Sequence, residues 1–216
     1  IVSWDFALST VPGLHQTIFA PYFVCGAIYS GTAGIVTVMY CLRRFLGFER
    51  YIGKIHVDYL GKLLIALSLI WTYINIMELF TGWYSGSSAE IEFLKFRLFG
   101  FYAPMYWEMI LFCAFVPLLM LFKSVRLNWN RMLVISILIN IGMLTERFII
   151  VSTALPRKFL PNSYGFYFPS PAEISITVGS FAMFATLFLI FIKVFPAVSI
   201  YEVKETLNPL RRAKKT

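Results

Sequence analysis

Five long apolar stretches constrain this chain more than any other feature of its sequence. A helix crosses the roughly 30 Å of bilayer hydrocarbon with about 20 apolar residues, and helices satisfy their own backbone groups there. The stretches run over about 17–41, 58–83, 100–122, 131–153 and 173–195. We therefore predict an all-α, polytopic transmembrane bundle with about five spanning helices over residues 1–198, followed by a basic tail over 199–216.

The composition fits a membrane protein better than a soluble one. Hydrophobic residues make up 59% of the chain and charged residues 14%, and the mean hydropathy is +0.74, well above the apolar share of ordinary soluble domains. The net charge of +8 would suggest a nucleic-acid partner in a soluble chain. In a membrane chain, the distribution of these basic residues over the loops indicates the orientation of the chain instead. We therefore predict membrane lipid around the chain and no nucleic acid.

The basic residues are distributed unevenly between the two sides of the predicted bundle. Twelve Lys and Arg lie in the loop after the first stretch, the turn after the third and the tail, against four in the opposite loops. By the positive-inside rule the first set, including the tail, is cytoplasmic. The segment before the first stretch then faces the periplasm. Because the chain begins at Ile1 without a signal peptide, we expect an N-terminal portion to be missing.

The few His and Cys residues exclude several kinds of site. Cys25, Cys41 and Cys113 lie in or at the end of apolar stretches without a CxxC or Cys/His pairing, which favours core packing. His15 and His56 are separated by helix of about 35 Å, which excludes a bis-His haem within the chain. No phosphate loop, HExxH motif or Ser/His/Asp arrangement is visible. We predict no metal, haem or iron-sulfur centre in this chain.

Ionisable residues within the stretches each need a partner or a function, because their insertion costs about 2.5–3.5 kcal/mol. Those of the outer half are Glu78, Glu108, Glu146 and Arg147, and those near the inner mouth of the second stretch are His56, Asp58 and Lys62. Consecutive residues of a helix point about 100° apart. We therefore expect Arg147 to be neutralised from another helix, by Glu78, Glu108 or Asp5.

A polar stripe runs along the second stretch. Ser68, Thr72 and Asn75 follow one another at spacings of four and three, which places them on one helical face. Together with Asp58 and Glu78 they fall within an arc of roughly 160°. Two interpretations remain open: a proton-conducting track, or ordinary hydrogen bonds of a helix buried in a bundle.

Two local patterns predict helix packing and a helix start. Gly26, Ser30 and Gly34 recur every four residues in the first stretch, and small residues allow membrane helices to approach closely. One face of this helix should therefore touch a neighbour. Ser170, Pro171 and Glu173 form a capping-box pattern with Pro at the first helical position, which predicts the start of the last span.

The segment SWDFALSTVPGLH, before the first stretch, combines an acid and an imidazole with aromatic residues. Asp5 and His15 stand with Trp4 and Phe6 at the predicted outer interface. An apolar cleft with these groups suits a quinol, whose oxidation releases two protons and two electrons. The electrons must leave to a centre outside this chain, which implies a partner that carries iron-sulfur or haem.

Several motifs resemble one known family. They are SWDFALSTVPGLHQTIFAPYFVCGAIYSG, HVDYLGKLL, INIMELFTGWYSG and NIGMLTERFIIVSTALPRKFLP. In this order they resemble the C-terminal half of the NrfD/PsrC family of membrane subunits, and they are most similar to the ActC-type subunit of bacterial alternative complex III. The resemblance extends over nearly all of the chain.

The resemblance implies a quinol-binding subunit of the bacterial inner membrane without a redox centre of its own. It implies a non-covalent quinone such as menaquinone, a periplasmic iron-sulfur subunit, haem c subunits and a second NrfD-like membrane subunit as partners. Asp5 matches an acid that lines the quinol pocket of the family. Proton half-channels are also proposed for the family, and His56, Asp58, Glu78, Glu146 and Arg147 match that role.

These observations lead to one main hypothesis and three alternatives. The main hypothesis is a non-autonomous subunit that oxidises quinol in a respiratory or photosynthetic complex, with coupling to proton translocation through the polar residues named above. The same residues would suit the quinone subunit of a polysulfide or nitrite reductase. A proton-coupled transporter should show paired repeats and broken helices, and the sequence indicates neither. A purely structural anchor would tolerate apolar replacement of the polar stripe.

Overall fold

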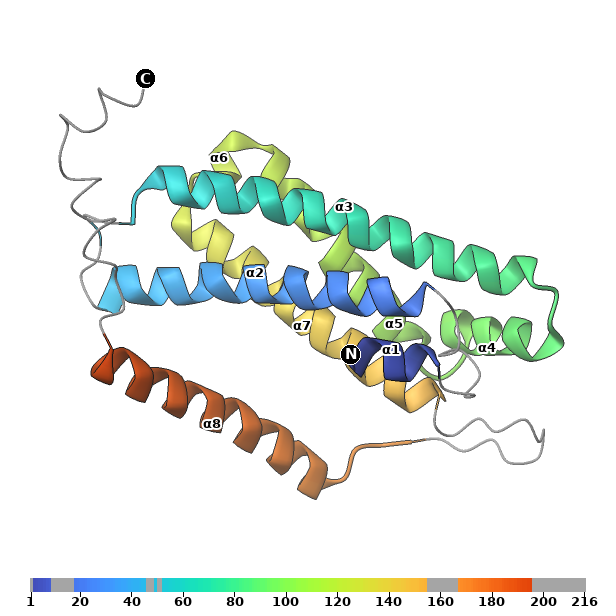
Figure 1. Ribbon diagram of the computed structural model, residues 1–216. Helices are drawn as coiled ribbons and strands as arrows, with labels where there is room; N and C mark the ends of the chain where they lie inside the picture. Colours follow the sequence, from blue (N-terminus) through green and yellow to red (C-terminus); the bar gives the residue numbers. More distant parts are fainter. Residues whose placement is uncertain (1, 9–17, 46–48, 50–51, 155–166, 196–216) are drawn as a thin grey trace. The chain divides into compact units, whose positions relative to one another are not determined.

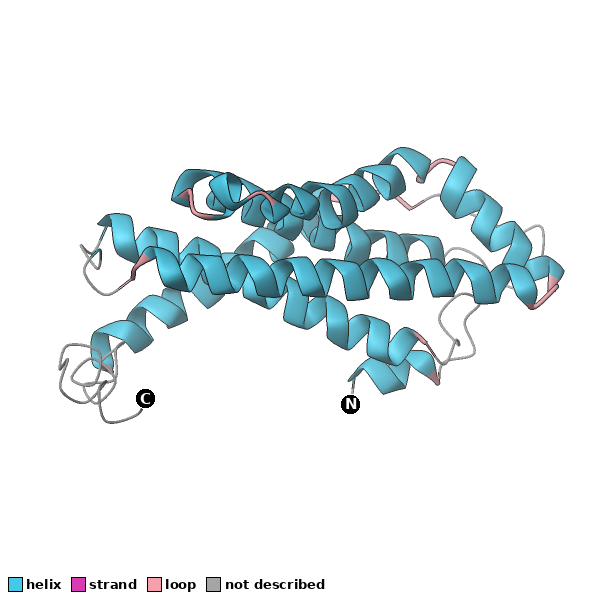
Figure 2. Cartoon of the chain, turned by 90° about the horizontal axis from the view of Figure 1, so that it is seen from above, coloured by secondary structure: helices cyan, strands magenta, loops and turns pink. Residues whose placement is uncertain are grey.

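The structure is a computed structural model that describes residues 2–8, 18–45, 49, 52–154 and 167–195, and these residues form helices and short turns without a strand (Figure 2). Five helical segments are long and apolar enough to cross a membrane, as predicted. They are α2 (Phe19–Phe45), α3 (Lys54–Tyr84), Ala103–Leu121, α7 (Trp129–Ala154) and α8 (Pro171–Val194). The expected all-α membrane bundle is confirmed.

The unit formed by residues 1–167 is a bundle in which α2 packs along both α3 and α7 (Figure 1). Three short helices complete it: α1 (Val2–Ala7), α4 (Ser88–Phe99) and α6 (Lys123–Arg126). We call the end where α2 begins and α3 ends the α4 end, and the opposite end, where α3 begins, the α6 end. The carboxylates Glu78 and Glu146 lie in the half nearer the α4 end.

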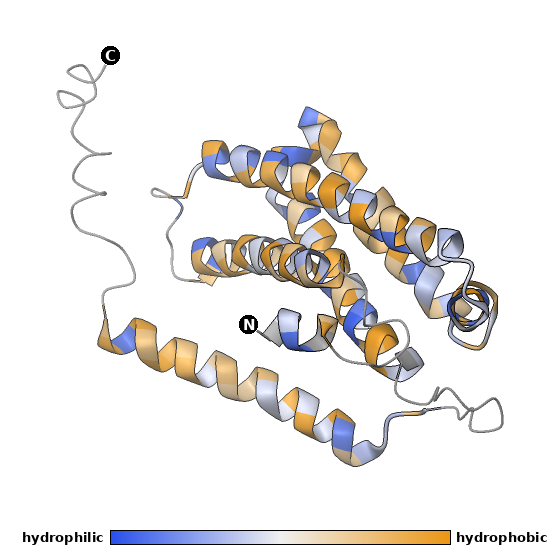
Figure 3. Ribbon diagram, turned by 45° about the vertical axis from the view of Figure 1, so that its right-hand side comes forward, coloured by the Kyte–Doolittle hydropathy of each residue, from blue (hydrophilic) through white to orange (hydrophobic). Residues whose placement is uncertain are grey.

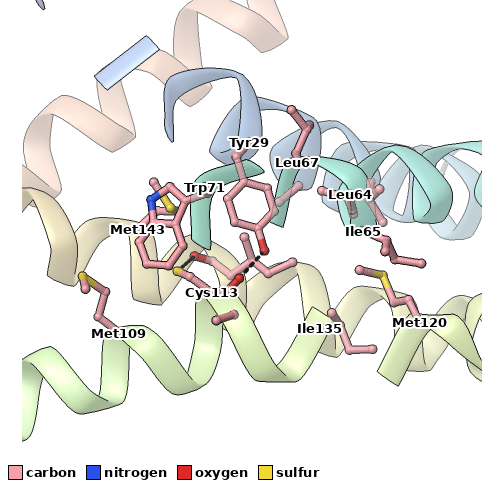
Figure 4. Close-up of a cluster of buried hydrophobic side chains, with 14 of the residues drawn as sticks. Tyr29, Leu64, Ile65, Leu67, Trp71, Met109, Cys113, Met120, Ile135 and Met143 are labelled. Atoms are coloured by element: carbon pink, nitrogen blue, oxygen red, sulfur yellow. Dashed lines mark hydrogen bonds between the residues drawn. The ribbon is translucent and has the colours of Figure 1, made fainter. Parts of the chain in front are cut away.

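The third span is a broken helix. α5 (Ala103–Ile110) continues as a π-helical turn over Leu111–Phe115 and a 3-10 turn over Val116–Leu121. Pro117 has no amide hydrogen, so the carbonyl of Cys113 loses its usual helical donor. The Tyr29 hydroxyl donates to this carbonyl instead, at 2.9 Å (Figure 4). The Ser68 hydroxyl also donates to it, at 2.8 Å. Two neighbouring helices thus satisfy the break. The expectation that the chain has no broken helix, which was set against a transporter, is wrong for this span.

The small-residue face of α2 is used over only part of its length. Gly26 lies directly against α7, where a Cβ atom would collide with the side chains of Arg147 and Met143. At Gly31 and Gly34 a Cβ atom would meet nothing within 4 Å among the described residues. The predicted close approach is therefore found at one glycine, because Gly31 is exposed and Gly34 half-buried, whereas the buried face of α2 continues through Tyr29, Ala33 and Val36.

α4 follows α3 after a tight turn and packs against both α3 and α5. Gly86 takes a left-handed conformation in this turn, with φ of 68°. The Ser85 hydroxyl donates to the Glu90 carboxylate at 2.6 Å, and the Trp107 indole donates to the Leu98 carbonyl at 3.3 Å. The sequence analysis treated this segment as a loop, whereas it is a helix that covers the ends of two spans.

The unit beyond residue 167 contains α8. The predicted capping box is present at its start, since the Ser170 amide donates to Glu173 at 2.6 Å and the Glu173 amide donates to the Ser170 hydroxyl at 3.4 Å. None of its described residues is buried, and most of its residues are apolar (Figure 3). The predicted tail over 199–216 lies outside the described residues.

Candidate functional site

Buried polar side chains from five helices meet in the half of the bundle nearer the α4 end. We call this set the polar cluster. Its members are Tyr22 of α2, Trp71, Asn75 and Glu78 of α3, Arg97 of α4, Tyr106 of α5, and Glu146 with Arg147 of α7. All of them except Arg147 are buried. A polar group removed from water must find a partner, so the contacts inside the cluster determine what it can do.

The first pair is formed by Glu78 and Arg97. Arg97 Nη1 donates to Glu78 Oε1 at 2.8 Å, and the side chains are only 3% and 7% exposed. The guanidinium also stacks over the Tyr106 ring, 5.0 Å from its centroid. Burial, the largest single influence, lowers the pKa of Arg97, but the Glu78 carboxylate together with Tyr22 and Tyr106 raises that pKa above its usual value. Arg97 therefore stays charged and holds Glu78 as a charge-assisted pair.

Asn75 connects the tyrosines of two other helices. Its amide nitrogen donates to the Tyr22 hydroxyl at 3.3 Å, and its amide oxygen accepts from the Tyr106 hydroxyl at 3.0 Å. Each of these side chains is buried. The three residues form a hydrogen-bonded bridge across α2, α3 and α5, which fixes the rotamers of all three side chains.

The second carboxylate, Glu146, is held differently from Glu78. The Trp71 indole donates to Glu146 Oε1 at 2.8 Å, and the Tyr22 hydroxyl lies beside the same carboxylate. Arg147 Nη2 is 3.5 Å from Glu146 Oε2, while it also donates to the Phe23 carbonyl and covers the Phe23 ring. Glu146 is thus fully buried but has a weaker cationic partner than Glu78.

The expected partner of Arg147 was wrong. We predicted that Glu78, Glu108 or Asp5 would neutralise Arg147. Arg97 takes Glu78 instead, and Arg147 turns toward its own neighbour Glu146. Consecutive residues of a helix point about 100° apart. The long Arg147 side chain nevertheless bends toward Phe23 of α2, and this brings its Nη2 close to the Glu146 carboxylate.

The cluster has hydrogen-bonding capacity left over. Among the described side chains, seven buried polar atoms have no hydrogen-bond partner in the protein, and five belong to the cluster: Glu78 Oε2, Arg97 Nε, Arg97 Nη2, Glu146 Oε2 and Arg147 Nη1. The Nε and Nη2 atoms of Arg97 lie on one edge of its guanidinium. This edge can donate to two oxygens side by side. Because buried polar atoms are nearly always satisfied, the cluster is suited to take up water or ligand oxygens.

The predicted polar stripe of α3 is only partly continuous. Ser68 and Asn75 point into the bundle, and Thr72 donates to the Ser68 carbonyl within α3. Between Ser68 and the α6 end, the buried residues of α3 are mainly apolar, among them Leu64. The polar side of α3 thus reaches from the polar cluster to the middle of the bundle.

A separate set of charges lies at the α6 end. Asp58 pairs with Lys62 at 2.7 Å and with Arg126, and Arg126 also donates to the Met120 carbonyl. His56 is exposed, and its Nδ1 accepts from the Gly53 amide at the start of α3. Asp58 therefore anchors α6 and the end of the third span to α3.

The residues predicted to bind quinol are only partly described. Trp4 and Asp5 are exposed on α1, which lies beside the start of α2 (Figure 1). The side chain of Phe6 and the whole of His15 lie outside the described residues. Glu108 is partly buried on α5. The quinol pocket and the proton pathway remain predictions, and Asp5 and the polar cluster share the α4 half of the bundle.

Four members of the polar cluster were not predicted from the sequence: Arg97, Tyr22, Trp71 and Tyr106. Arg97 was counted among loop cations, although Ser87-x-x-Glu90 before an apolar run is typical of a helix start. The aromatic residues carry no such pattern, because their positions in apolar stretches are those of ordinary core residues. No group of three His, Cys, Asp or Glu side chains in the described part of the chain is arranged to hold a metal ion.

One family model matches most of the chain. The family model described as polysulphide reductase, NrfD, matches residues 3–157. This range covers α1 to α7 with the whole polar cluster, and α8 lies beyond it. No curated protein matches the chain.

Proposed function

Because the chain belongs to the NrfD polysulphide reductase family, we propose that it is the quinol-binding and quinol-oxidising membrane subunit of a multi-subunit electron-transfer complex. The family match covers the bundle up to α7 and agrees with a multi-pass membrane protein. The observation that carries the proposal is the polar cluster, which keeps two carboxylates buried beside unused donors and acceptors.

Quinol oxidation needs acceptors for two protons. In our proposal Asp5 and His15 contact the hydroxyl groups of the quinol ring, with Trp4 and Phe6 forming apolar walls. A carboxylate and an imidazole are suitable bases because their pKa values respond to small changes in environment. The polar cluster lies in the same half of the bundle, where protons from such a site are released.

The two carboxylates of the cluster suit different tasks. Glu78 is locked by the buried Arg97 at 2.8 Å, so it serves to hold α4 in place and to keep the cluster polar. Glu146 has hydrogen bonds from Trp71 and only a longer contact to Arg147. Glu146 is therefore our candidate for proton exchange, and Tyr22 and Asn75 connect it to the rest of the cluster.

The remaining predicted pathway residues extend this proposal toward the α6 end. His56 and Asp58 would mediate proton exchange at that side, and Ser68 and Thr72 would lead from it toward Asn75. Glu108 would act at the α4 end. The buried residues of α3 near Leu64 are apolar, so a pathway along α3 needs bound water over that stretch.

Electrons from the quinol would pass to a partner, because the family resemblance gives this chain no redox centre. We propose an assembly like alternative complex III in a bacterial inner membrane, with menaquinone as the quinone and the C-terminal tail on the cytoplasmic side. Its partners would be a periplasmic iron-sulfur subunit, haem c subunits and a second NrfD-like subunit.

A second candidate is the quinone subunit of a polysulfide or nitrite reductase complex. The description of the matching family as polysulphide reductase favours this alternative. Purification of the intact complex separates the two. Quinol-dependent reduction of a haem c subunit without reduction of polysulfide or nitrite supports the first candidate, and quinol-dependent reduction of polysulfide or nitrite supports the second. Photolabelling by a quinone analogue within residues 2–45 would support quinol binding in either case, and labelling only of partner subunits would contradict it.

A further inference from the structure

An apolar groove lies between the last turns of α3 and α4. Its volume is about 450 Å³, and it is lined by four residues of α3 between Ile76 and Trp83 and by five residues of α4 between Ile91 and Phe99. Lys95 is the only charged residue in this lining. The groove therefore combines an apolar floor with a single ammonium group.

The groove and the polar cluster use opposite faces of the same two helices. Glu78 and Arg97 point into the bundle and are buried, whereas Phe80, Trp83 and Phe99 of the groove are 51%, 66% and 80% exposed. The groove thus faces the surroundings of the bundle. In a membrane those surroundings are lipid or another protein chain.

The depth of the groove follows from the aromatic residues around it. Trp83, Tyr84 and Trp107 are exposed at the ends of α3 and α5, and exposed Trp and Tyr residues gather at the level of lipid head groups. The Trp107 indole donates to the Leu98 carbonyl of α4, so Lys95, about one helical turn before Leu98, is at a comparable level and can extend its ammonium group toward the interface. The apolar floor below it then lies in hydrocarbon.

The lining distinguishes between the possible occupants. Helices pack closely in membranes where small residues allow it, and the groove is lined by Ile, Leu, Phe, Trp and Lys without a Gly, Ala or Ser. A quinone head group would need several hydrogen-bonding partners, and the groove has one cation. An apolar chain with an anionic head fits both the floor and the charge.

We infer that this groove binds one acyl chain of an anionic phospholipid, with the phosphate group on Lys95. The inference is independent of quinol oxidation. It assigns α4 a second role, in which its inner face carries Arg97 into the polar cluster and its outer face holds a lipid at the edge of the bundle.

The test is photocrosslinking in nanodiscs that contain the intact complex. A phosphatidylglycerol that carries a diazirine in its acyl chain should label peptides of 76–83 and 91–99 more strongly than the matching phosphatidylcholine. Lys95→Gln should lower that labelling about fivefold, the effect of one interfacial Lys. The matched control Lys123→Gln, on α6, should leave labelling of the groove unchanged. Leu94→Trp, which fills the groove without a change in charge, should abolish the labelling.

Four results would overturn the inference. They are equal labelling by the two lipids, no effect of Lys95→Gln, labelling by a diazirine quinone in place of the phospholipid, and a crosslink from this groove to a partner subunit. Quinol turnover of the same preparations is measured in parallel. Normal turnover together with loss of lipid labelling separates the lipid site from the proposed function.

Discussion

Arg97 of α4 and Glu78 of α3 form a buried ion pair, with 2.8 Å between Nη1 and Oε1. The two residues come from a short helix and a spanning helix, so the pair attaches α4 to the bundle. Removal of one partner from a buried pair leaves an uncompensated charge, which costs about 3–5 kcal/mol. Removal of both charges costs much less.

Arg97→Gln should therefore destabilise the protein by about 3–5 kcal/mol, because Glu78 would be left as a lone buried charge. The double variant Arg97→Gln with Glu78→Gln should recover most of that loss. The measurement is denaturant unfolding in lipid-free detergent. Lys95→Gln, an exposed cation on the same helix, is the matched control and should change stability by less than about 0.5 kcal/mol. Equal losses in the single and double variants would show that the pair is unimportant.

The carbonyl of Cys113 gives a second prediction. Tyr29→Phe or Ser68→Ala alone should cost about 0.6 kcal/mol, a typical hydrogen bond between membrane helices, because the other hydroxyl still donates to the carbonyl. Both changes together should cost more than the sum, since the carbonyl is then left without a donor. A double-mutant cycle on unfolding free energy measures the difference. Strict additivity would mean that the two hydroxyls do not share this acceptor.

Gly26 and Gly34 provide a matched pair on α2. Gly26→Val should lower the midpoint of thermal unfolding by several degrees, because the new side chain displaces Arg147 and Met143 of α7. Gly34→Val should be tolerated by the isolated subunit, since a Cβ atom there meets no atom within 4 Å in the described part of the chain. Comparable losses at Gly26 and Gly34 would contradict the close approach of α2 to α7 at Gly26.

Glu146→Gln tests the assignment of proton exchange. Gln can still accept the hydrogen bond from the Trp71 indole but cannot carry a proton, so assembly should persist while quinol turnover falls at least about tenfold. Steady-state turnover of the purified complex measures this. Glu49→Gln, an exposed acid near the start of α3, is the control. Turnover at the normal rate in Glu146→Gln would reduce Glu146 to a structural role.

The length of the apolar stretches was sufficient to predict five spanning segments, because hydrocarbon thickness sets the length of a helix directly. The Ser170 and Glu173 capping box was also predictable, since it depends only on neighbours in sequence. Both features are local. The break in the third span could be predicted less well. Pro117 is visible in the sequence, but the donors to the freed Cys113 carbonyl, Tyr29 and Ser68, come from two other helices.

The polar cluster was only partly predictable. Its carboxylates stood out because charges are rare in apolar stretches, whereas Tyr22 and Tyr106 resemble ordinary core residues. Arg97 was missed because a charged residue between two spans suggests a loop, although a helix there folds back onto the bundle. The partner of Arg147 depends on side-chain direction, which sequence spacing does not determine.

We propose that this chain oxidises quinol at the segment that contains Asp5. The most direct measurement is the rate of quinol-dependent reduction of the partner's redox centre in membranes that contain Asp5→Asn, with subunit content checked and Glu49→Gln as control. We predict a rate at least about tenfold lower than that of the unaltered protein, with normal assembly. An unchanged rate in a fully assembled Asp5→Asn complex would contradict the claim.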